Sequence, residues 1–403
     1  MSEQGTTPPA AAFTELPDLA VRTLGGSVVY ANDELFAARE NLIEPSPPVF
    51  SPDAFGLRGK IYDGWETRRR REPGHDYALI RLGAPGVIRG VIVDTSFFTG
   101  NFPPEVSVEA TGVEAYPSPA ELADASWVPI VPRSAVQGDA RSCFEVRDGH
   151  RFTHVRLSIY PDGGVARLRV HGEVVPDPRH LAGTVDLAAV ENGGVIVGCS
   201  EQFYSSAANL IQPGRARTMA DGWENARRRG GGNDWVTVRL AAAGRLRYAE
   251  LDTSRFFGNA PGWARLSGAS QRLPASAAAP PAGEGAEDGS DGSWFELLPR
   301  TRLQPDTRHR LMMGSHPPVA VVRLDVYPDG GMARLRLWGE PDPAAHSAAA
   351  ARWLDSLLAA QAVRVLQDAG VSQERAGQVA AVQAGRLDLL ADEARAALTP
   401  SFS

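Results

Sequence analysis

A duplicated motif is the feature that most constrains how this chain can fold. Residues 63–71, Asp-Gly-Trp-Glu-Thr-Arg-Arg-Arg-Arg, return 158 positions later as residues 221–229, Asp-Gly-Trp-Glu-Asn-Ala-Arg-Arg-Arg. Asp-Gly favours a tight turn, because glycine tolerates the positive φ that such turns demand. Tryptophan needs a core to pack against. A carboxylate beside several guanidinium groups suits a small, planar anionic ligand. The repetition predicts a duplicated fold with part of a site on each copy.

Other segments repeat in the same order and identify the secondary structure. Residues 25–36 return as 193–204, a displacement of 168, so the first copy carries extra loop before its Asp-Gly-Trp. The turn Tyr-Pro-Asp-Gly-Gly at 160–164 returns at 327–331. Apolar and polar residues alternate around these turns, which is typical of strands bounded by Gly and Pro. The sequence predicts a mainly β protein with two tandem antiparallel jelly-roll β-sandwiches.

The 403 residues are enough for two or three domains, each with its own core. We expect a surface insertion at 278–292, which is rich in Gly, Ala, Glu and Asp. The predicted domains are a flexible tail at 1–15, a first sandwich at 16–178, a second sandwich at 179–343 and a helical extension at 344–403.

The C-terminal extension shows helical rather than strand periodicity. Apolar residues from Trp353 to Val365 fall at helical spacing, and Gly370 is expected to end that helix. Ser372 is the expected N-cap of a second helix that continues to Leu398. We expect this pair to pack on the sandwiches or on a neighbouring subunit, and we assign it no chemistry.

Composition excludes several classes of protein. The net charge is −7, from 41 basic and 48 acidic residues, which argues against a broad surface for nucleic acid or anionic membranes. Two cysteines cannot build a disulfide framework, and no zinc-ligand spacing is present. No apolar run approaches a membrane span, and the first residues lack the pattern of a signal peptide. The expected location is therefore the cytoplasm.

Comparison of the two copies singles out candidate site residues. The pairs Asp94-Thr95 and Asp252-Thr253 end apolar strands and so belong at a sandwich rim, where ligands bind or where Asx turns cap loops. The copies differ at His75, which becomes Asn233, and at Phe97, which becomes Arg255. A further histidine follows Pro305-Asp306-Thr307-Arg308. A histidine beside an aspartate can serve as a general base, although most such surface pairs have no catalytic role.

Taken together, these motifs resemble the allantoicase family from about residue 25 to residue 340. Arg255 stands where that family usually carries a histidine. The residues that carry the resemblance are 63–71, Pro73-Gly74-His75-Asp76, Val93-Asp94-Thr95, Phe98-Thr99-Gly100-Asn101, Asp221-Gly222-Trp223-Glu224, Gly232-Asn233-Asp234-Trp235, Asp252-Thr253, Gly258-Asn259 and Pro305-Asp306-Thr307-Arg308-His309.

The resemblance implies a hydrolase that converts allantoate to ureidoglycolate and urea in allantoin and purine degradation. It also implies tandem jelly-roll domains of the galactose-binding type and a homo-oligomer, with a hexamer suggested. The partner is then a small-molecule substrate, allantoate, and not a nucleic acid or a membrane.

Allantoate carries a carboxylate and two ureido groups, so guanidiniums should hold it while proton carriers release urea. The acid–base candidates are Glu66, His75, Asp76, Glu224, Asp234 and His309. The substrate-binding candidates are Arg69, Arg70, Asn101, Arg228, Arg255 and Asn259. No spacing demands a metal, and none is predicted. Asp94 and Asp252 are the carboxylates that would hold a divalent ion if one binds.

Two other functions fit parts of the sequence. A non-catalytic pair of galactose-binding-like modules could hold a carbohydrate or a small polar anion, but such a surface favours exposed aromatics over clustered arginines. An assembly scaffold would explain the helical extension but not the repeated charged motif. Release of urea from allantoate distinguishes all three functions.

Overall fold

The computed structural model describes residues 11–270 and 294–400, so the expected insertion at 278–292 lies outside the described residues. The chain forms two compact units, residues 1–175 with 356–362 and residues 176–355 with 363–403. The first unit ends close to the boundary predicted after residue 178.

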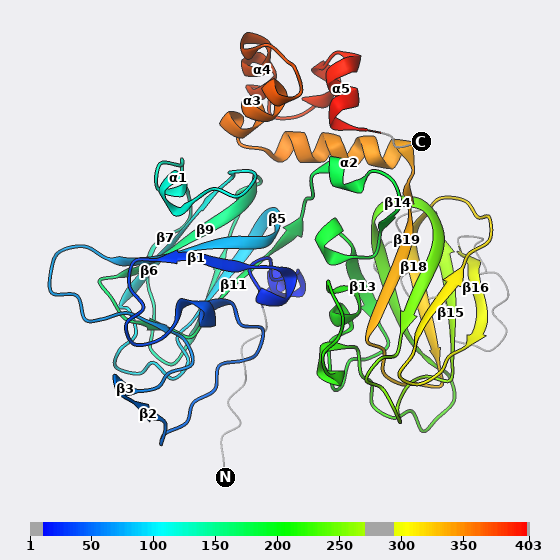
Figure 1. Cartoon of the computed structure of the whole chain (residues 1–403), viewed down its shortest axis with the longest axis horizontal. Helices are drawn as coiled ribbons and strands as arrows, with labels where there is room; N and C mark the ends of the chain where they lie inside the picture. Colours follow the sequence, from blue (N-terminus) through cyan, green and yellow to red (C-terminus); the bar gives the residue numbers. More distant parts are fainter. Residues whose placement is uncertain (1–10, 271–293, 401–403) are drawn as a thin grey trace. The chain divides into compact units, whose positions relative to one another are not determined.

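Unit 1 is organised around β5, Asp76–Asp94, which is long enough to serve both layers of a sandwich (Figure 1). The first part of β5 pairs with β1 and β9, and the second part pairs with β8 and β11. The other elements of this unit are β1 Ser27–Ala31, β2 Phe55–Gly56, β3 Gly59–Lys60, β4 Trp65–Glu66, β6 Glu105–Thr111, β7 Val128–Ala135, β8 Arg141–Glu145, β9 Arg151–Tyr160, β10 Gly164–Val165, β11 Arg167–Val174, α1 Pro119–Ala123, η1 Ala12–Glu15, η2 Arg22–Leu24 and η3 Arg39–Ile43.

Unit 2 repeats this plan around β14, Asp234–Asp252. The first part of β14 pairs with β13 and β18, and the second part pairs with β17 and β19. The predicted pair of antiparallel sandwiches is confirmed. The other elements are η4 Pro178–Leu181, β12 Val185–Asp186, η5 Val190–Asn192, β13 Val195–Cys199, η6 Ala207–Ile211, η7 Met219–Asp221, β15 Trp263–Ala269, β16 Trp294–Arg302, β17 Arg308–Met312, β18 Val319–Tyr327 and β19 Arg334–Pro341.

The core of each sandwich lies between its two layers and is made by apolar side chains from the long strands and their neighbours. Ile80, Val155 and Leu157 are fully buried in unit 1, and Val238 and Leu324 are fully buried in unit 2. Burial of such a side chain contributes roughly 1.5–3 kcal/mol to folding. The rims, where strands end and loops begin, are therefore the places left for polar chemistry.

The flexible tail predicted for residues 1–15 is wrong for residues 12–15, and residues 1–10 lie outside the described residues. Residues Ala12–Glu15 form η1, and Phe13 within it is buried. The reason is a local fit to a residue without a side chain, since a Cβ on Gly90 would lie 2.2 Å from the Phe13 ring. Residues 12–15 therefore pack on the first sandwich.

The predicted pair of C-terminal helices is also corrected. The segment forms four helices, α2 Pro343–Ser356, α3 Ala359–Asp368, α4 Gln373–Ala380 and α5 Asp392–Leu398, with the short turn η9 Leu387–Leu389. Ser372 does cap α4, since its side chain accepts a hydrogen bond from the Arg375 backbone NH at 3.4 Å. Within the described residues, no helix is both long enough and apolar enough to cross a membrane.

Two repeated turns and their adjoining clefts

The Asp-Gly-Trp-Glu turns are held by their tryptophans, as predicted. Trp65 and Trp223 are fully buried. The indole NH of Trp65 donates to the Asp33 carbonyl oxygen at 2.8 Å, and that of Trp223 donates to the Glu201 carbonyl oxygen at 3.0 Å. This anchoring fixes the residue that follows each tryptophan, which is a glutamate in both copies.

The glycine of each turn serves a purpose other than the one predicted. Gly222 has a φ of −109°, so the turn does not need a left-handed residue. Glycine is needed instead because a side chain at this position would collide with neighbouring backbone. A Cβ on Gly222 would lie 2.6 Å from the Met332 carbonyl oxygen, and a Cβ on Gly64 would lie 2.7 Å from that of Val165. Glycine lets the turn approach the neighbouring strand.

Each turn glutamate meets an asparagine that was also predicted for the site. The Asn101 amide donates to Glu66 Oε1 at 2.7 Å, and the Asn259 amide donates to Glu224 Oε1 at 2.7 Å. Burial raises the pKa of Glu66, although the hydrogen bond from Asn101 acts in the opposite direction. We refer to these contacts as the two carboxyl–amide pairs. They bring together residues 35 positions apart in each copy.

A second set of predicted residues pairs internally. Arg70 Nη1 lies 3.6 Å from Asp76 Oδ1, and Arg228 Nη2 contacts Asp234 Oδ1. Asp76 and Asp234 are buried. In repeat 2 the Asn225 amide also donates to Asp234 Oδ2 at 3.0 Å. These aspartates therefore position the arginine segment, and buried ion pairs of this kind are available to a substrate only if they open.

The two candidate histidines lie in different surroundings. His75 packs against Tyr160, with ring centroids 4.7 Å apart. Burial, followed by the nearby charges of Arg156 and Arg70, lowers the pKa of His75. His309 Nε2 accepts a hydrogen bond from the Gln304 backbone NH at 2.9 Å, and Nδ1 lies 3.0 Å from the Leu251 carbonyl oxygen. Because the backbone engages both ring nitrogens of His309, that side chain holds a loop in place.

Two clefts occupy equivalent rim positions in the two sandwiches. The repeat-1 cleft has a volume of about 350 Å³ and is lined by Pro45, Pro47, Pro48, Asp94, Ser96, Phe97, Arg141, Arg167 and Arg169. The repeat-2 cleft has a volume of about 480 Å³ and is lined by Arg215, Ala216, Arg217, Ser254, Arg255 and Asp306. Guanidinium groups line both clefts, as a site for a small anion requires, while three prolines and Phe97 add apolar surface to the repeat-1 cleft.

The arginines of the repeat-1 cleft have partners within the protein. Arg167 is almost fully buried, and its Nη2 lies 2.8 Å from Asp63 Oδ2. Arg169 Nη1 lies 3.5 Å from Asp18 Oδ2, and Arg141 Nε lies 3.8 Å from Asp94 Oδ2. The carboxylates of the protein itself already offset most of the positive charge of this cleft.

The repeat-2 cleft has more guanidinium charge to offer a ligand. Arg217 Nε lies 3.5 Å from Asp221 Oδ2, while Arg215 and Arg255 form no ion pair with any residue the structure describes. Arg255 has a φ of 75°, and its backbone NH donates to Asp306 Oδ1 at 2.8 Å. A non-glycine residue held in this conformation is a pointer to function, although Phe97 adopts it too in repeat 1.

The repeat-2 cleft and the Glu224–Asn259 pair share their supporting loops. Arg255 and Asn259 lie on the loop after β14, and Asn259 Nδ2 lies 3.8 Å from Met219 Sδ on η7. Arg217 hydrogen-bonds through its backbone NH to Asp221, the last residue of η7. One rim of unit 2 thus carries a carboxyl group, an amide and a guanidinium cluster.

Sequence comparison missed the arginines other than Arg255 that line the clefts. Arg167 and Arg169 recur as Arg334 and Arg336, 167 positions later, which was a usable signal. Arg215 and Arg217 follow a turn and match Pro47 and Val49 in the first copy, so nothing in the pattern marked them. The predicted candidate Arg69 is exposed and is not among the residues that line either cleft.

The rim aspartates cap their own turns. Asp94 Oδ1 accepts a hydrogen bond from the Ser96 backbone NH at 2.8 Å, and Asp252 Oδ1 accepts one from Ser254 at 2.8 Å. In residues 11–270 and 294–400, no three His, Cys, Asp or Glu side chains gather in a way that could hold a metal ion.

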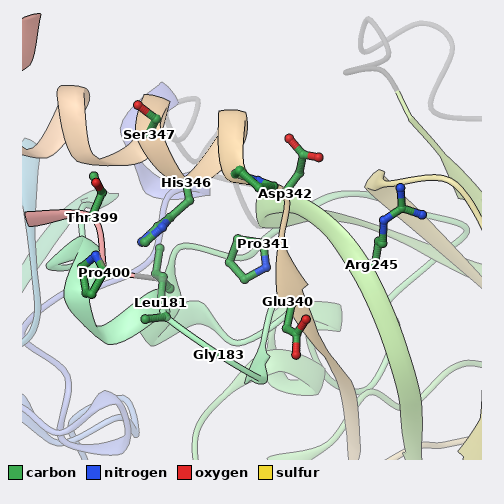
Figure 2. Close-up of a pocket in the computed structure, with 12 residues that line it drawn as sticks. Leu181, Gly183, Arg245, Glu340, Pro341, Asp342, His346, Ser347, Thr399 and Pro400 are labelled. Carbon is green, nitrogen blue, oxygen red and sulfur yellow. The ribbon is translucent and has the colours of Figure 1, made fainter. Parts of the chain in front are cut away.

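Another cavity in unit 2, of about 440 Å³, involves none of the predicted site residues (Figure 2). His346 on α2 reaches into it beside Leu181, and the ring Nε2 of His346 donates to the Pro178 carbonyl oxygen at 2.8 Å. Glu340 is paired with Arg247. The hydrogen bond of His346 therefore joins α2 to η4, while the Glu340–Arg247 pair joins β19 to β14.

Comparison with known proteins identifies relatives across both repeats. A family model described as the allantoicase repeat matches residues 17–175 and 185–342. A protein of Nocardia farcinica described as "Probable allantoicase" is 55% identical over 332 residues, 81% of this chain and 95% of that protein. A Streptomyces coelicolor protein with the same description is 51% identical over 341 residues, 81% of this chain and 86% of that protein.

Solved structures agree with these sequence matches. A structure titled "Structure of allantoicase" has a TM-score of 0.68 and 36% identity, and the match covers 81% of this chain and 93% of that one. Allantoicase from Saccharomyces cerevisiae has a TM-score of 0.65 and 35% identity, with 80% and 92% covered. The family-model match ends at residue 342, before the C-terminal helices begin.

Proposed function

Because the chain belongs to the allantoicase family, we propose that its repeat-2 cleft is where it hydrolyses allantoate to ureidoglycolate and urea. The enzyme is a hydrolase of carbon–nitrogen bonds in linear amidines and ureides. This assignment sets aside a purely carbohydrate-binding or scaffolding role.

We choose the repeat-2 cleft because some of its arginines are not paired with carboxylates of the protein. Arg215 and Arg255 line the cleft and have no carboxylate partner among the described residues, whereas the arginines of the repeat-1 cleft do. A bound carboxylate gains charge-assisted hydrogen bonds from such groups, and these are about twice as strong as neutral ones. The substrate's carboxylate would lie between Arg215, Arg217 and Arg255.

We assign the proton transfer to Glu224, because its partner Asn259 lies on the same loop as Arg255. In its acid form it donates a proton to the ureido nitrogen on the central carbon, so that the carbon–nitrogen bond breaks and urea leaves. The remaining ureido group supports the resulting C=N bond. Glu224, now a carboxylate, takes a proton from water as the hydroxyl adds to that carbon, and ureidoglycolate forms. One carboxyl group thus completes the cycle, with Asn259 orienting it at 2.7 Å.

Urea release by matched variants tests this proposal. Glu224→Gln keeps the size of the side chain and an oxygen that can accept from Asn259, but it cannot transfer a proton. We expect kcat to fall about 10²–10⁴-fold. Glu66→Gln is the same change at the equivalent position of repeat 1, and we expect less than about a tenfold effect. If Glu66→Gln abolishes urea release and Glu224→Gln does not, the site belongs in repeat 1.

A further inference from the structure

The repeat-2 cleft holds one carboxylate among its arginines. Asp306 is the acidic side chain of the six residues that line this cleft, and Arg215, Arg217 and Arg255 are the basic ones. Asp306 is exposed, and its carboxylate forms no ion pair with any residue that the structure describes. Like charges repel, so the carboxylate of a bound substrate can face the arginines but not Asp306.

One oxygen of the Asp306 carboxylate holds a turn, as the equivalent aspartate does in repeat 1. Asp306 Oδ1 accepts a hydrogen bond from the Arg255 backbone NH at 2.8 Å, and Asp139 Oδ1 accepts one from the Phe97 backbone NH at 2.8 Å. Asp139 and Asp306 also share a positive φ, of 50° and 48°. Asp139, however, is not among the residues that line the repeat-1 cleft. In repeat 2 the turn therefore leaves Asp306 Oδ2 at the cleft, without a partner among the described residues.

A serine hydroxyl of the cleft also differs between the repeats. In repeat 1 the Ser96 hydroxyl donates to Asp94 Oδ1 at 2.5 Å. In repeat 2 the Ser254 backbone NH donates to Asp252 Oδ1 at 2.8 Å, but the Ser254 hydroxyl forms no hydrogen bond within the part of the chain that the structure describes. Because Ser254 lines the repeat-2 cleft, that cleft offers a ligand a hydroxyl group as well as a carboxylate oxygen.

We propose that Asp306 and Ser254 recognise a ureido group of the substrate and so fix the direction in which it binds, an inference that rests on the proposed function of the repeat-2 cleft. A ureido group presents N–H donors beside a carbonyl oxygen. A carboxylate oxygen accepts from such N–H groups, and a hydroxyl donates to such a carbonyl oxygen. Charge favours the same orientation, because the arginines attract the carboxylate of the substrate and Asp306 repels it.

This arrangement makes the cleft selective for acids that have one anionic end and one ureido end. A dicarboxylate of the same length would bring its second negative charge against the Asp306 carboxylate, and such repulsive contacts are a common way to reject a wrong ligand. Asp306 is thus a specificity-determining residue, and proton transfer remains with Glu224.

Calorimetric binding of two small acids to the full chain tests this selectivity without turnover. Ureidoacetate carries one carboxylate and one ureido group, and it lacks the second ureido group on which formation of the C=N bond depends. Succinate has the same length and carries a second carboxylate in place of the ureido group. We expect the wild type to bind ureidoacetate at least about tenfold more tightly than succinate, as for one hydrogen bond to a charged group.

Replacement of Asp306 by asparagine should remove this preference. Asp306→Asn suits the positive φ and keeps an oxygen that accepts from the Arg255 backbone NH, but it replaces Oδ2 with an NH2 group. That group donates to a carboxylate and cannot accept from a ureido N–H. We expect the preference for ureidoacetate over succinate to fall about 10- to 100-fold.

Two further variants separate this inference from the proposed function. Asp139→Asn makes the same change in the equivalent turn of repeat 1, outside both clefts, and should leave both dissociation constants unchanged. Arg255→Asn should weaken binding of both acids. If it does so while Asp306→Asn leaves the preference intact, the inference is wrong and the site stands. If Arg255→Asn affects neither acid, or neither acid binds the wild type, the proposed site is wrong and this inference falls with it.

Discussion

The carboxyl group of Glu66 is partly buried, and no cationic side chain among the described residues forms an ion pair with it. Among the residues that the structure describes, its side chain accepts a hydrogen bond from the neutral amide of Asn101 at 2.7 Å. Burial raises the pKa of Glu66 above its ordinary value of 4.5. The sequence predicted Glu66 as a candidate, because a glutamate follows the tryptophan in both turns. It could not predict that this glutamate would be buried beside an amide. The partner lies 35 residues away and is brought close only by the folded loops.

Replacement of Glu66 by glutamine should stabilise the protein at neutral pH. Because the pKa of Glu66 is higher in the folded state, the folded state binds the proton more tightly than the unfolded state does. The protonated side chain therefore contributes to the free energy of unfolding below pH 4.5, and this contribution is lost as pH rises through the folded pKa. Glutamine carries no charge to desolvate. We expect a higher urea midpoint for Glu66→Gln at about pH 7 and no difference at about pH 4. Equal midpoints at both pH values would contradict this assignment of the burial effect.

Loss of Arg255 should weaken substrate binding more than turnover. Arg255→Asn suits the backbone, because asparagine tolerates a positive φ. We expect KM for allantoate to rise about 10- to 100-fold with a smaller change in kcat, as for removal of one charge-assisted hydrogen bond. Arg247→Asn, an exposed arginine outside the cleft, is the control. An unchanged KM would remove Arg255 from the binding site.

At the scale of elements, the repeated turns and the strands next to them were the most predictable parts. The Asp-Gly-Trp turn and the Tyr-Pro-Asp-Gly-Gly hairpin both occur where the sequence placed them, because local turn chemistry decides such segments. The role of the turn glycine was wrong, since close approach to the Met332 carbonyl is a tertiary contact. The C-terminal segment was predicted as two helices and forms four, because apolar spacing alone does not show where a helix ends.

Replacement of the turn glycine by alanine tests whether the turn must approach the Met332 carbonyl oxygen closely. Gly222→Ala places a Cβ 2.6 Å from the Met332 carbonyl oxygen, which is backbone and has little room to move. We expect a loss of about 1–3 kcal/mol in the free energy of unfolding, measured in urea. Gly231→Ala is the matched control, because nothing lies within 4 Å of its Cβ and its φ is not left-handed. Equal stability of the two variants would contradict the steric explanation.

Strand β9 carries a buried histidine that should make the fold sensitive to acid. Burial lowers the pKa of His154 from 6.5 to about 4, and the charge of Arg81 adds to this. The unfolded chain binds the proton more readily, so this contribution is complete above pH 6.5 and is lost as pH falls towards 4, by up to about 3 kcal/mol. Urea unfolding of His154→Gln should show a weaker pH dependence, and His180→Gln should behave like the wild type.

At the scale of the whole molecule, duplication explains the features that the two repeats share, and divergence between the repeats is the basis on which we propose the site. Both copies keep the buried tryptophan and the carboxyl–amide pair, while the clefts differ in which arginines are neutralised by the protein. The sequence predicted the two sandwiches and the family, and it singled out Arg255, which lines the repeat-2 cleft. It could not predict Arg215 and Arg217 as cleft residues, because they come from a loop whose position depends on the folded rim.

A crystal structure of Glu224→Gln soaked with allantoate tests the central claim most directly, because this variant should bind the substrate without consuming it. The claim predicts density for allantoate in the repeat-2 cleft, with its carboxylate within hydrogen-bond distance of Arg255 and of Arg215 or Arg217, and a ureido nitrogen facing residue 224. Allantoate bound in the repeat-1 cleft, or at any place away from these arginines, would contradict it.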